Sequence, residues 1–225
     1  MNSPNSQAEE SAMIKVYGST LSPFVRKVVV VLAEKGLDYE LIPAGLQAHS
    51  TDFLSVSPFG KMPGFRDGDF AISDSSAIVH YLDAKYPEPR LIPQTPEDLG
   101  RAVWYDEFGD TIVTASAGKV FFNRVVAPRF LKQSGNEDMV QQGIAELPRL
   151  FDYLEGVVPE PGDFLVGGAL SLADIAVASP FVNLSHCAVD VDCAKHPRLG
   201  AWLPTILSRP SFAAPIVEET AFLAA

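Results

Sequence analysis

The chain has 225 residues, of which 47% are hydrophobic and 20% charged, and its formal net charge at pH 7 is −11. This composition supports a packed core, in one large domain or two small ones, and the acidic balance argues against nucleic acid as a partner. No apolar run reaches the roughly 18 residues of a membrane span, and no signal-peptide pattern begins the chain, so we expect a cytoplasmic protein without a membrane partner. Cys187 and Cys193 are too few for a disulfide framework, and we expect both to be buried thiols.

A helix start follows the first strand candidate. Residues 14–17 form a short apolar run, and residues 23–35 predict a helix with Ser22 at the N-cap and Pro23 at the first helical position. The four valines at 28–31 alone favour a strand, but the length and the Ser-Pro start favour a buried helix. A helix N-terminus presents unpaired N–H groups and the positive end of a dipole, so this one suits an anion or a thiolate.

The next segment completes a small sheet. Residues 39–42 predict a second strand, and strand, helix and strand together indicate a right-handed βαβ unit with parallel strands. A loop with one helical turn at 52–54 precedes an antiparallel hairpin, whose strands at 64–66 and 69–72 meet at an Asp-Gly turn. A helix with one apolar face follows and ends before Pro87.

The second half of the chain is predicted to be helical. We expect a disordered lead-in at 1–11, an α/β domain at 12–87, a proline-rich linker at 88–96 and an all-helical domain at 97–225. The helices expected in that domain span 97–117, 120–131 with a kink or break at Pro128, 137–156 with a bend or restart near Pro148, 172–184, 197–207 and 212–223.

Ser171 and Asp174 have the spacing of a capping box at a helix start, with Asp in place of the usual Glu. Leu170 and Ile175 occupy the two positions of a hydrophobic staple around it. This pattern indicates a structural role. Replacing either box residue by alanine is expected to cost about 1 kcal/mol of stability as a lost cap.

A βαβ-ββα unit, a proline linker and an all-helical domain follow one another in this chain. The motifs along it are Ser22-Pro-Phe-Val-Arg-Lys-Val28, Pro58-Phe-Gly-Lys-Met-Pro63, Asp67-Gly-Asp69, Ile72-Ser-Asp-Ser-Ser-Ala-Ile78 and Ser171-Leu-Ala-Asp-Ile-Ala176. In this order the chain resembles the cytosolic glutathione transferases, of a serine type similar to bacterial members. The resemblance implies a thioredoxin-like α/β domain followed by an all-α helical bundle, with glutathione as co-substrate and no metal.

The Met62-Pro63 pair is the first glutathione-binding element that the resemblance implies. In the family the corresponding proline is cis, and the residue before it offers its backbone to the cysteinyl part of glutathione. A cis X-Pro bond is uncommon and usually marks a tight turn. From the residues alone, an ordinary trans proline at a strand start is the alternative.

Further glutathione contacts are implied at two loops and a helix start. Asp74 and Ser75 match the acidic-Ser pair that binds the γ-glutamyl end, where helix N–H groups hold its carboxylate and Asp74 pairs with its ammonium. A plain N-cap is the alternative for Asp74. Lys61 and His49 lie where a basic residue meets a carboxylate of glutathione, although His49 also fits a solvated loop. Phe24 follows the active-site serine and is expected to line the site.

Ser22 is the residue expected to stabilise the glutathione thiolate. A cysteine-like thiol has a pKa of about 8.5, so little thiolate exists at neutral pH unless the site lowers that value. A hydrogen bond to the sulfur anion contributes about 1.5–3 kcal/mol and a helix N-terminus up to about 2 kcal/mol, which together account for about two pKa units. No histidine or acid adjoins Ser22 to make it a nucleophile, so we expect a hydrogen-bond donor.

Alternatives to this role remain open. Ser22 by itself also fits a plain helix cap. Tyr17 lies near the position where tyrosine-type members of the family carry their donor, and Ser19 is a lesser rival in the loop. A redox role is disfavoured, because this helix start has Ser22-Pro-Phe-Val25 where thioredoxins have Cys-x-x-Cys.

The resemblance predicts conjugation of glutathione to small hydrophobic electrophiles, or peroxide reduction, by a homodimer. The electrophile is expected in the cleft between the domains, against aromatic residues at helical spacing: Trp104, Tyr105, Phe108 and Phe121. A non-catalytic binding relative is one alternative function, and a glutathione-dependent isomerase or lyase of a catabolic pathway is another. The Ser-Ser-Cys signature of the maleylacetoacetate isomerase group is absent.

Overall fold

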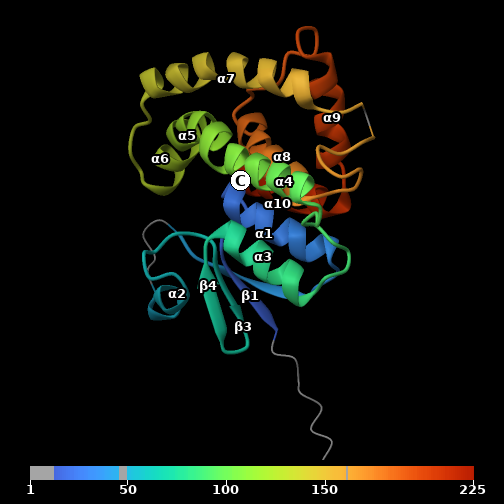
Figure 1. Cartoon of the computed structure of the whole chain (residues 1–225). Coiled ribbons are helices and arrows are strands. Elements are labelled where there is room, and N and C mark those ends of the chain that lie inside the picture. The colour runs from blue at the N-terminus through green and yellow to red at the C-terminus, as the bar shows by residue number, and fades with distance from the viewer. Residues whose placement is uncertain (1–12, 46–49, 161) are drawn as a thin grey trace, which may run out of the picture.

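The computed structural model describes residues 13–45, 50–160 and 162–225, so the lead-in predicted at 1–11 lies outside the described residues. A four-stranded mixed sheet with helices is followed by an all-helical part, and two helices lie between the sheet and that part (Figure 1). The predicted fold class, a thioredoxin-like domain followed by a helical domain, is confirmed.

The first part forms a sheet in the strand order β2-β1-β3-β4. Its elements are β1 (Ile14–Gly18), α1 (Pro23–Glu34), β2 (Tyr39–Pro43), α2 (Thr51–Val56), β3 (Gly64–Asp67), β4 (Phe70–Ser73) and α3 (Ser75–Lys85). β1 pairs with β2 in parallel and with β3 antiparallel, and β3 and β4 form an antiparallel hairpin. The predicted parallel pair and the predicted hairpin are therefore confirmed.

The second part consists of one long interrupted helix and four further helices among the described residues. Its elements are α4 (Pro96–Glu107), η1 (Phe108–Val113), α5 (Thr114–Phe121), η2 (Phe122–Val126), α6 (Ala127–Phe130), α7 (Glu137–Val157), α8 (Leu172–Ser185), α9 (Pro197–Leu207) and α10 (Pro210–Ala224). The labels η1 and η2 denote π-helical segments, in which the hydrogen bonds span five residues instead of four.

Two helix predictions need correction. Separate helices were expected at 97–117 and at 120–131, with a kink or break at Pro128 in the second, but helical structure runs from 96 to 130 with two π segments. Pro128 lies in the first turn of α6. A bend or a restart was expected near Pro148; α7 is one helix that contains Pro148 at an exposed position, so it does not restart there.

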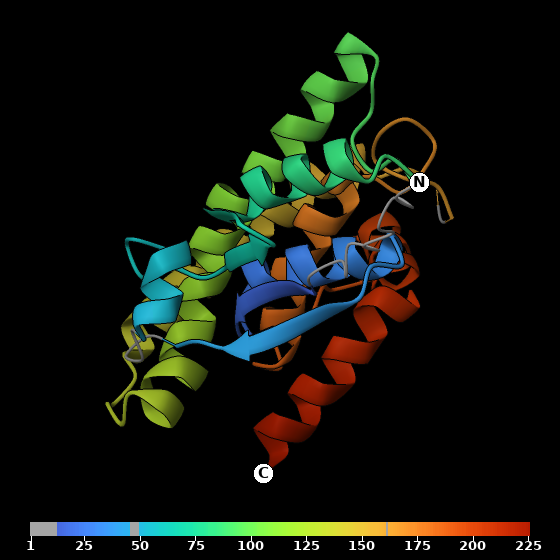
Figure 2. The same ribbon diagram turned by 90° about the horizontal axis from the view of Figure 1, so that it is seen from below.

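α1 is the central helix of the molecule. It packs against α3, α8 and α10, and Figure 2 shows the red helix α10 running beside the blue helix α1. Its valines at 28–31 are buried in the main core, which covers the sheet and continues into the helical domain. Tyr17 of β1 belongs instead to a small second cluster with Phe53 and Val56 of α2. Tertiary burial on all sides thus allows a valine-rich segment to be a helix.

The two cysteines differ in exposure. Cys187 is buried, as expected, but Cys193 is exposed, so the prediction of two buried thiols is wrong for Cys193. It lies in the turns between α8 and α9, and such connections run over the protein surface. No helix among the residues that the structure describes has the length and apolar character needed to cross a membrane.

Candidate functional site

A cavity of about 490 Å³ lies between the α/β domain and the long helix of the second domain. Its lining includes six of the residues predicted to bind glutathione: Phe24, Lys61, Met62, Pro63, Asp74 and Ser75. The other lining residues are Ser57, Phe59, Ser73, Ser76, Glu107, Asp110 and Thr111. His49 lies outside the described residues.

The Met62-Pro63 peptide bond is cis, as the resemblance implied. Met62 lies close to Gly18 at the end of the first strand. A Cβ added to Gly18 would stand 3.4 Å from the Met62 Cβ and 2.6 Å from Val25 Cγ2. Gly18 also has a φ of 151°, which side chains rarely adopt. A glycine here lets the loop that leads to Ser22 pass directly beside Met62.

Ser22 begins α1 through its backbone. Its N–H donates to the Ser19 carbonyl at 2.9 Å, and its own carbonyl accepts from the Arg26 N–H at 2.9 Å. Its side chain makes no capping hydrogen bond, and no partner for Ser22 Oγ is seen among the described residues. Ser22 is half-buried and does not itself line the cavity, although Phe24 does. The hydroxyl therefore has no hydrogen-bond partner to give up among the described residues, and it lies two residues from Phe24 of the cavity lining.

Tyr17, the alternative donor, has its hydroxyl engaged elsewhere. Its OH donates to Asp52 Oδ2 at 2.8 Å, and its ring is 1% exposed and stacked on Phe53. Burial, followed by the hydrogen bond to Asp52, raises the pKa of the Tyr17 phenol above 10.0. Ser19 Oγ accepts a long hydrogen bond of 3.4 Å from the Leu21 N–H within the loop.

Asp74 and Ser75 begin α3 at the edge of the cavity. Asp74 is the N-cap, and its Oδ1 accepts from the Ala77 N–H at 3.0 Å while the residue stays exposed. The plain capping role is therefore present, and Oδ2 has no partner among the described residues. Ser75 is buried, and its hydroxyl lies 3.4 Å from Asp110 Oδ2.

Asp110 is a cavity residue that the sequence patterns did not single out. Its Oδ2 lies 2.6 Å from Lys27 Nζ, which also contacts Asp106 Oδ1 at 2.7 Å and Ser76 Oγ at 3.1 Å. Burial raises the pKa of Asp110 above 3.8, against the opposing effect of Lys27. The sequence contained one signal for it: Glu107, Asp110 and Thr111 are polar residues at helical spacing and could have been predicted to share a face toward the cavity. The prediction for this segment relied on its aromatic residues instead.

The aromatic residues expected around the electrophile lie elsewhere. Trp104 and Phe108 line a second cavity of about 610 Å³, together with residues of α7 that include Tyr153. Tyr105 and Phe121 are buried in the main core, and burial raises the pKa of Tyr105 to about 12. The structure thus does not bring these four side chains to the cavity that contains Met62 and Pro63. Among the described residues no group of three or more His, Cys, Asp or Glu side chains could hold a metal ion.

Comparison with known proteins gives matches over most of the chain. Residues 16–90 match the family model "Glutathione S-transferase, N-terminal domain", and residues 113–210 match "Glutathione S-transferase, C-terminal domain". The chain is 45% identical over 218 residues to "Glutathione S-transferase Z1" of Arabidopsis thaliana, which covers 92% of this chain and 92% of the relative.

Solved structures agree with these matches. A glutathione S-transferase from Rhodospirillum rubrum F11 superposes with a TM-score of 0.82 at 26% identity, covering 90% of this chain and 91% of that chain. Glutathione S-transferase I from mais, in complex with an atrazine glutathione conjugate, superposes with a TM-score of 0.78 at 25% identity, covering 94% of this chain and 98% of that chain.

Proposed function

The chain belongs to the glutathione S-transferase family and is a glutathione transferase, and from this premise we propose that Ser22 stabilises the glutathione thiolate for attack on small hydrophobic electrophiles. One contrast between two hydroxyl groups carries the proposal. The Ser22 hydroxyl makes no capping bond at the α1 N-terminus, whereas the Tyr17 hydroxyl donates to Asp52. Of these two hydroxyls, Ser22 can donate to a sulfur anion without first giving up a partner, and Tyr17 cannot.

The chemistry needs a lower thiol pKa. The glutathione thiol releases its proton to solvent, the Ser22 O–H donates a hydrogen bond to the resulting sulfur anion, and the positive end of the α1 dipole stabilises the same negative charge. The sulfur then forms a bond to the electrophilic carbon, and the leaving group departs with its electron pair. α1 has no acidic residue in its first turn, so nothing within the helix offsets its positive end.

The rest of the cavity suits the other parts of the tripeptide. The Met62 backbone is proposed to pair with the cysteinyl part, and N–H groups at the start of α3 with the γ-glutamyl carboxylate. Asp74 and Asp110 together supply negative charge for the adjoining ammonium, because both line the cavity beside Ser75. Lys61 and His49 are proposed to meet the glycyl carboxylate. The bound product in the mais structure is itself a glutathione conjugate.

The electrophile is proposed to lie against Phe24 and Met62. Both side chains line the cavity, as does exposed Phe59. Trp104, one of the aromatic residues predicted to contact the electrophile, is 47% exposed and could contact a ligand. It lines the cavity of about 610 Å³, however, and not the cavity that contains Met62.

The test compares Ser22→Ala with Tyr17→Phe, each of which removes one hydroxyl. With a chromogenic halonitrobenzene at a pH below the thiol pKa, Ser22→Ala is expected to lower kcat/KM by about 10- to 100-fold, as for a lost hydrogen bond to a charged group. Tyr17→Phe is expected to stay within about threefold of wild type. An active wild type with an unaffected Ser22→Ala variant would remove Ser22 from the mechanism, and a wild type that neither conjugates nor binds glutathione would indicate a non-catalytic relative.

A homodimer is part of the same proposal. Several large apolar side chains are exposed on α4, η1 and α7, namely Val103 at 42%, Trp104 at 47%, Ile112 at 39% and Tyr153 at 37%. A soluble monomer seldom exposes such a contiguous patch, and a two-fold related copy would cover it. Sedimentation should show a dimer for wild type and for Phe222→Glu, whose side chain on α10 is 55% exposed, and a monomer for Trp104→Glu. A monomeric wild type would contradict the proposal.

A further inference from the structure

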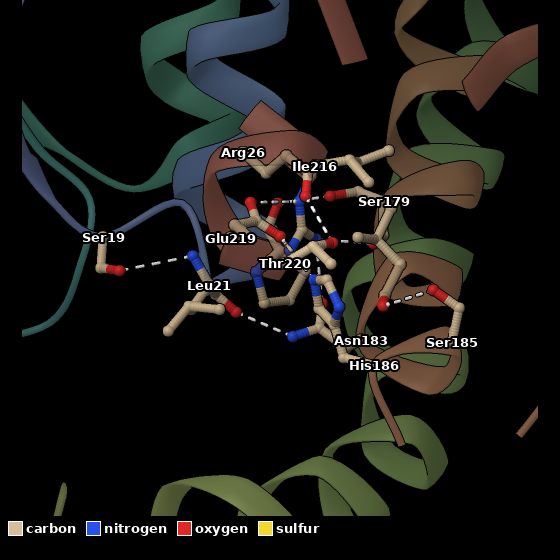
Figure 3. A network of polar contacts seen from close by, with 12 residues as sticks. Ser19, Leu21, Arg26, Ser179, Asn183, Ser185, His186, Ile216, Glu219 and Thr220 are labelled. Carbon is tan, nitrogen blue, oxygen red and sulfur yellow. Dashed lines mark hydrogen bonds and ion pairs between the residues drawn. The ribbon is translucent and has the colours of Figure 1, made fainter. Parts of the chain in front are cut away.

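Two side chains of α8 bind the backbone on either side of Ser22. Asn183 Nδ2 donates to the Leu21 carbonyl at 2.8 Å, and Ser179 Oγ donates to the Pro23 carbonyl at 2.8 Å. Figure 3 shows Asn183 reaching Leu21 from the α8 ribbon. The helical domain therefore holds the carbonyls of the residues before and after Ser22, although α8 lies about 160 residues further along the chain.

Arg26 fixes the orientation of the Asn183 amide. Its Nη1 donates to Asn183 Oδ1 at 2.9 Å and to the Ser179 carbonyl at 2.8 Å. A guanidinium can only donate, so the amide oxygen must face Arg26 and the amide N–H must face Leu21. Arg26 is one turn beyond Ser22 on α1, and its N–H donates to the Ser22 carbonyl.

Glu219 of α10 in turn holds Arg26. Its two carboxylate oxygens accept from Arg26 Nε at 3.0 Å and from Nη2 at 2.6 Å, and Oε2 also lies 2.9 Å from His186 Nε2 (Figure 3). Arg26 is 0% exposed, Glu219 2% and Asn183 3%. Apolar residues can replace a buried ion pair of this kind without loss of stability, so stabilisation does not by itself explain why Arg26 and Glu219 are buried here. The geometry that they impose on their neighbours explains it better. A fully satisfied polar network specifies one arrangement of the backbone that it binds.

We propose that Asn183 and Ser179 are positioning residues, which fix the carbonyls of Leu21 and Pro23, the neighbours of Ser22 in the chain, and thereby direct the Ser22 hydroxyl at the glutathione sulfur. The Leu21–Ser22 peptide is held through its carbonyl by Asn183, and the Ser22–Pro23 peptide through its carbonyl by the Arg26 N–H, while Ser179 holds the carbonyl of the next peptide along. Because each peptide group is planar, these contacts together restrain the Ser22 backbone angles and the direction of its Cβ. A small displacement of a catalytic group lowers the rate strongly. The inference rests on the proposed role of Ser22 as thiolate donor.

The first test replaces one hydroxyl on α8 at a time. Ser179→Ala removes the bond to Pro23 but leaves the Ser179 carbonyl for Arg26. The matched control is Ser185→Ala, which removes a 3.0 Å bond from Oγ to the Val182 carbonyl on the same helix. We expect Ser179→Ala to raise the pKa of the bound thiol, read from the pH profile of kcat/KM, by about half a unit to one unit. The loss of kcat/KM should disappear at alkaline pH, and Ser185→Ala should match wild type.

A second variant and a double mutant show whether the effect acts through Ser22. Asn183→Leu is close in size and removes both amide bonds, so we expect a larger rise of the thiol pKa than for Ser179→Ala. If Asn183→Leu does not fold, the Ser179→Ala profile decides alone. In a Ser22→Ala background, Ser179→Ala is expected to add no further shift, because the hydroxyl that it positions is absent.

The outcomes separate the two proposals. A lower unfolding midpoint for Ser179→Ala with a wild-type pH profile would mean that the network is structural only, which overturns the inference and leaves the Ser22 donor intact. The same follows if Ser179→Ala shifts the thiol pKa equally with and without Ser22. A wild-type thiol pKa in Ser22→Ala itself would overturn the donor role and, with it, the positioning role.

Discussion

The serines at the starts of α8 and α1 serve opposite purposes. At α8, Ser171 is 2% exposed and forms a capping box with Asp174, whose carboxylate accepts from the Ser171 N–H at 2.9 Å and the Leu165 N–H at 2.7 Å. At α1, Ser22 is half-buried and its hydroxyl caps nothing. The third residue after Ser22 is Val25, an apolar residue, where α8 has an acid. One helix N-terminus is thus satisfied within the chain, and the other remains available to an anion.

The largest expected effect is a loss of stability when the capping box at the start of α8 is removed. Asp174→Ala should lower the free energy of unfolding by about 2–4 kcal/mol, because Asp174 is 0% exposed and its loss leaves buried N–H groups without partners. This exceeds the loss of about 1 kcal/mol expected from the sequence pattern, which cannot show burial. Urea unfolding would measure it. A cost below about 1 kcal/mol would show that water replaces the carboxylate.

The same carboxyl group should make stability depend on pH. Burial raises the pKa of Asp174 from 3.8 to about 6. The folded state therefore takes up this proton first as the pH falls, so the contribution of Asp174 to stability rises between about pH 6 and pH 4. As the pH falls from about 6 to about 4, the free energy of unfolding of wild type is expected to increase by up to about 3 kcal/mol relative to that of Asp174→Asn. Urea unfolding at several pH values measures this difference. If wild type neither gains nor loses stability relative to Asp174→Asn as the pH falls, or if it loses stability relative to that variant, the raised pKa is contradicted.

The smallest expected effect is on the stability of the two serine variants. Ser171→Ala should lower the free energy of unfolding by about 1 kcal/mol and leave kcat/KM nearly unchanged. Ser22→Ala should change stability by less than about 0.5 kcal/mol, because its hydroxyl makes no capping bond, while it lowers activity. Thermal and urea unfolding beside the conjugation assay measure both. Equal stability losses would show that Ser22 is an ordinary cap in solution.

Local patterns were enough to predict most of the α/β domain. The Ser-Pro start and the length of the segment identified α1 despite its valines, and the Asp-Gly turn identified the hairpin of β3 and β4. The cis bond before Pro63, in contrast, was implied only by the family resemblance, because the residues alone also fit a trans proline. The α1 start, the hairpin and the capping box follow from short motifs. Each of these depends on residues close together in the chain, so the sequence contains the whole signal.

The helical domain was harder to predict, because its details depend on contacts between distant segments. Gly109 lies in η1 where a Cβ would stand 2.5 Å from the Ala176 carbonyl oxygen of α8, a close approach that no local pattern reveals. A π-helical turn also changes which residues share a face of the helix. Trp104 and Phe108 therefore line the second cavity, while Asp110 and Thr111 line the first.

The sequence by itself determined the order of the elements, the two-domain architecture and the residue types at the α1 start, because short-range spacing and capping chemistry encode them. Only the tertiary structure decided which hydroxyl is available. Tyr17 and Ser22 are five residues apart, but Asp52 of α2 occupies the Tyr17 hydroxyl, while Asn183 and Ser179 of α8 bind the carbonyls beside Ser22. These partners meet only when the chain packs, so no local pattern shows which of the two hydroxyls is already occupied.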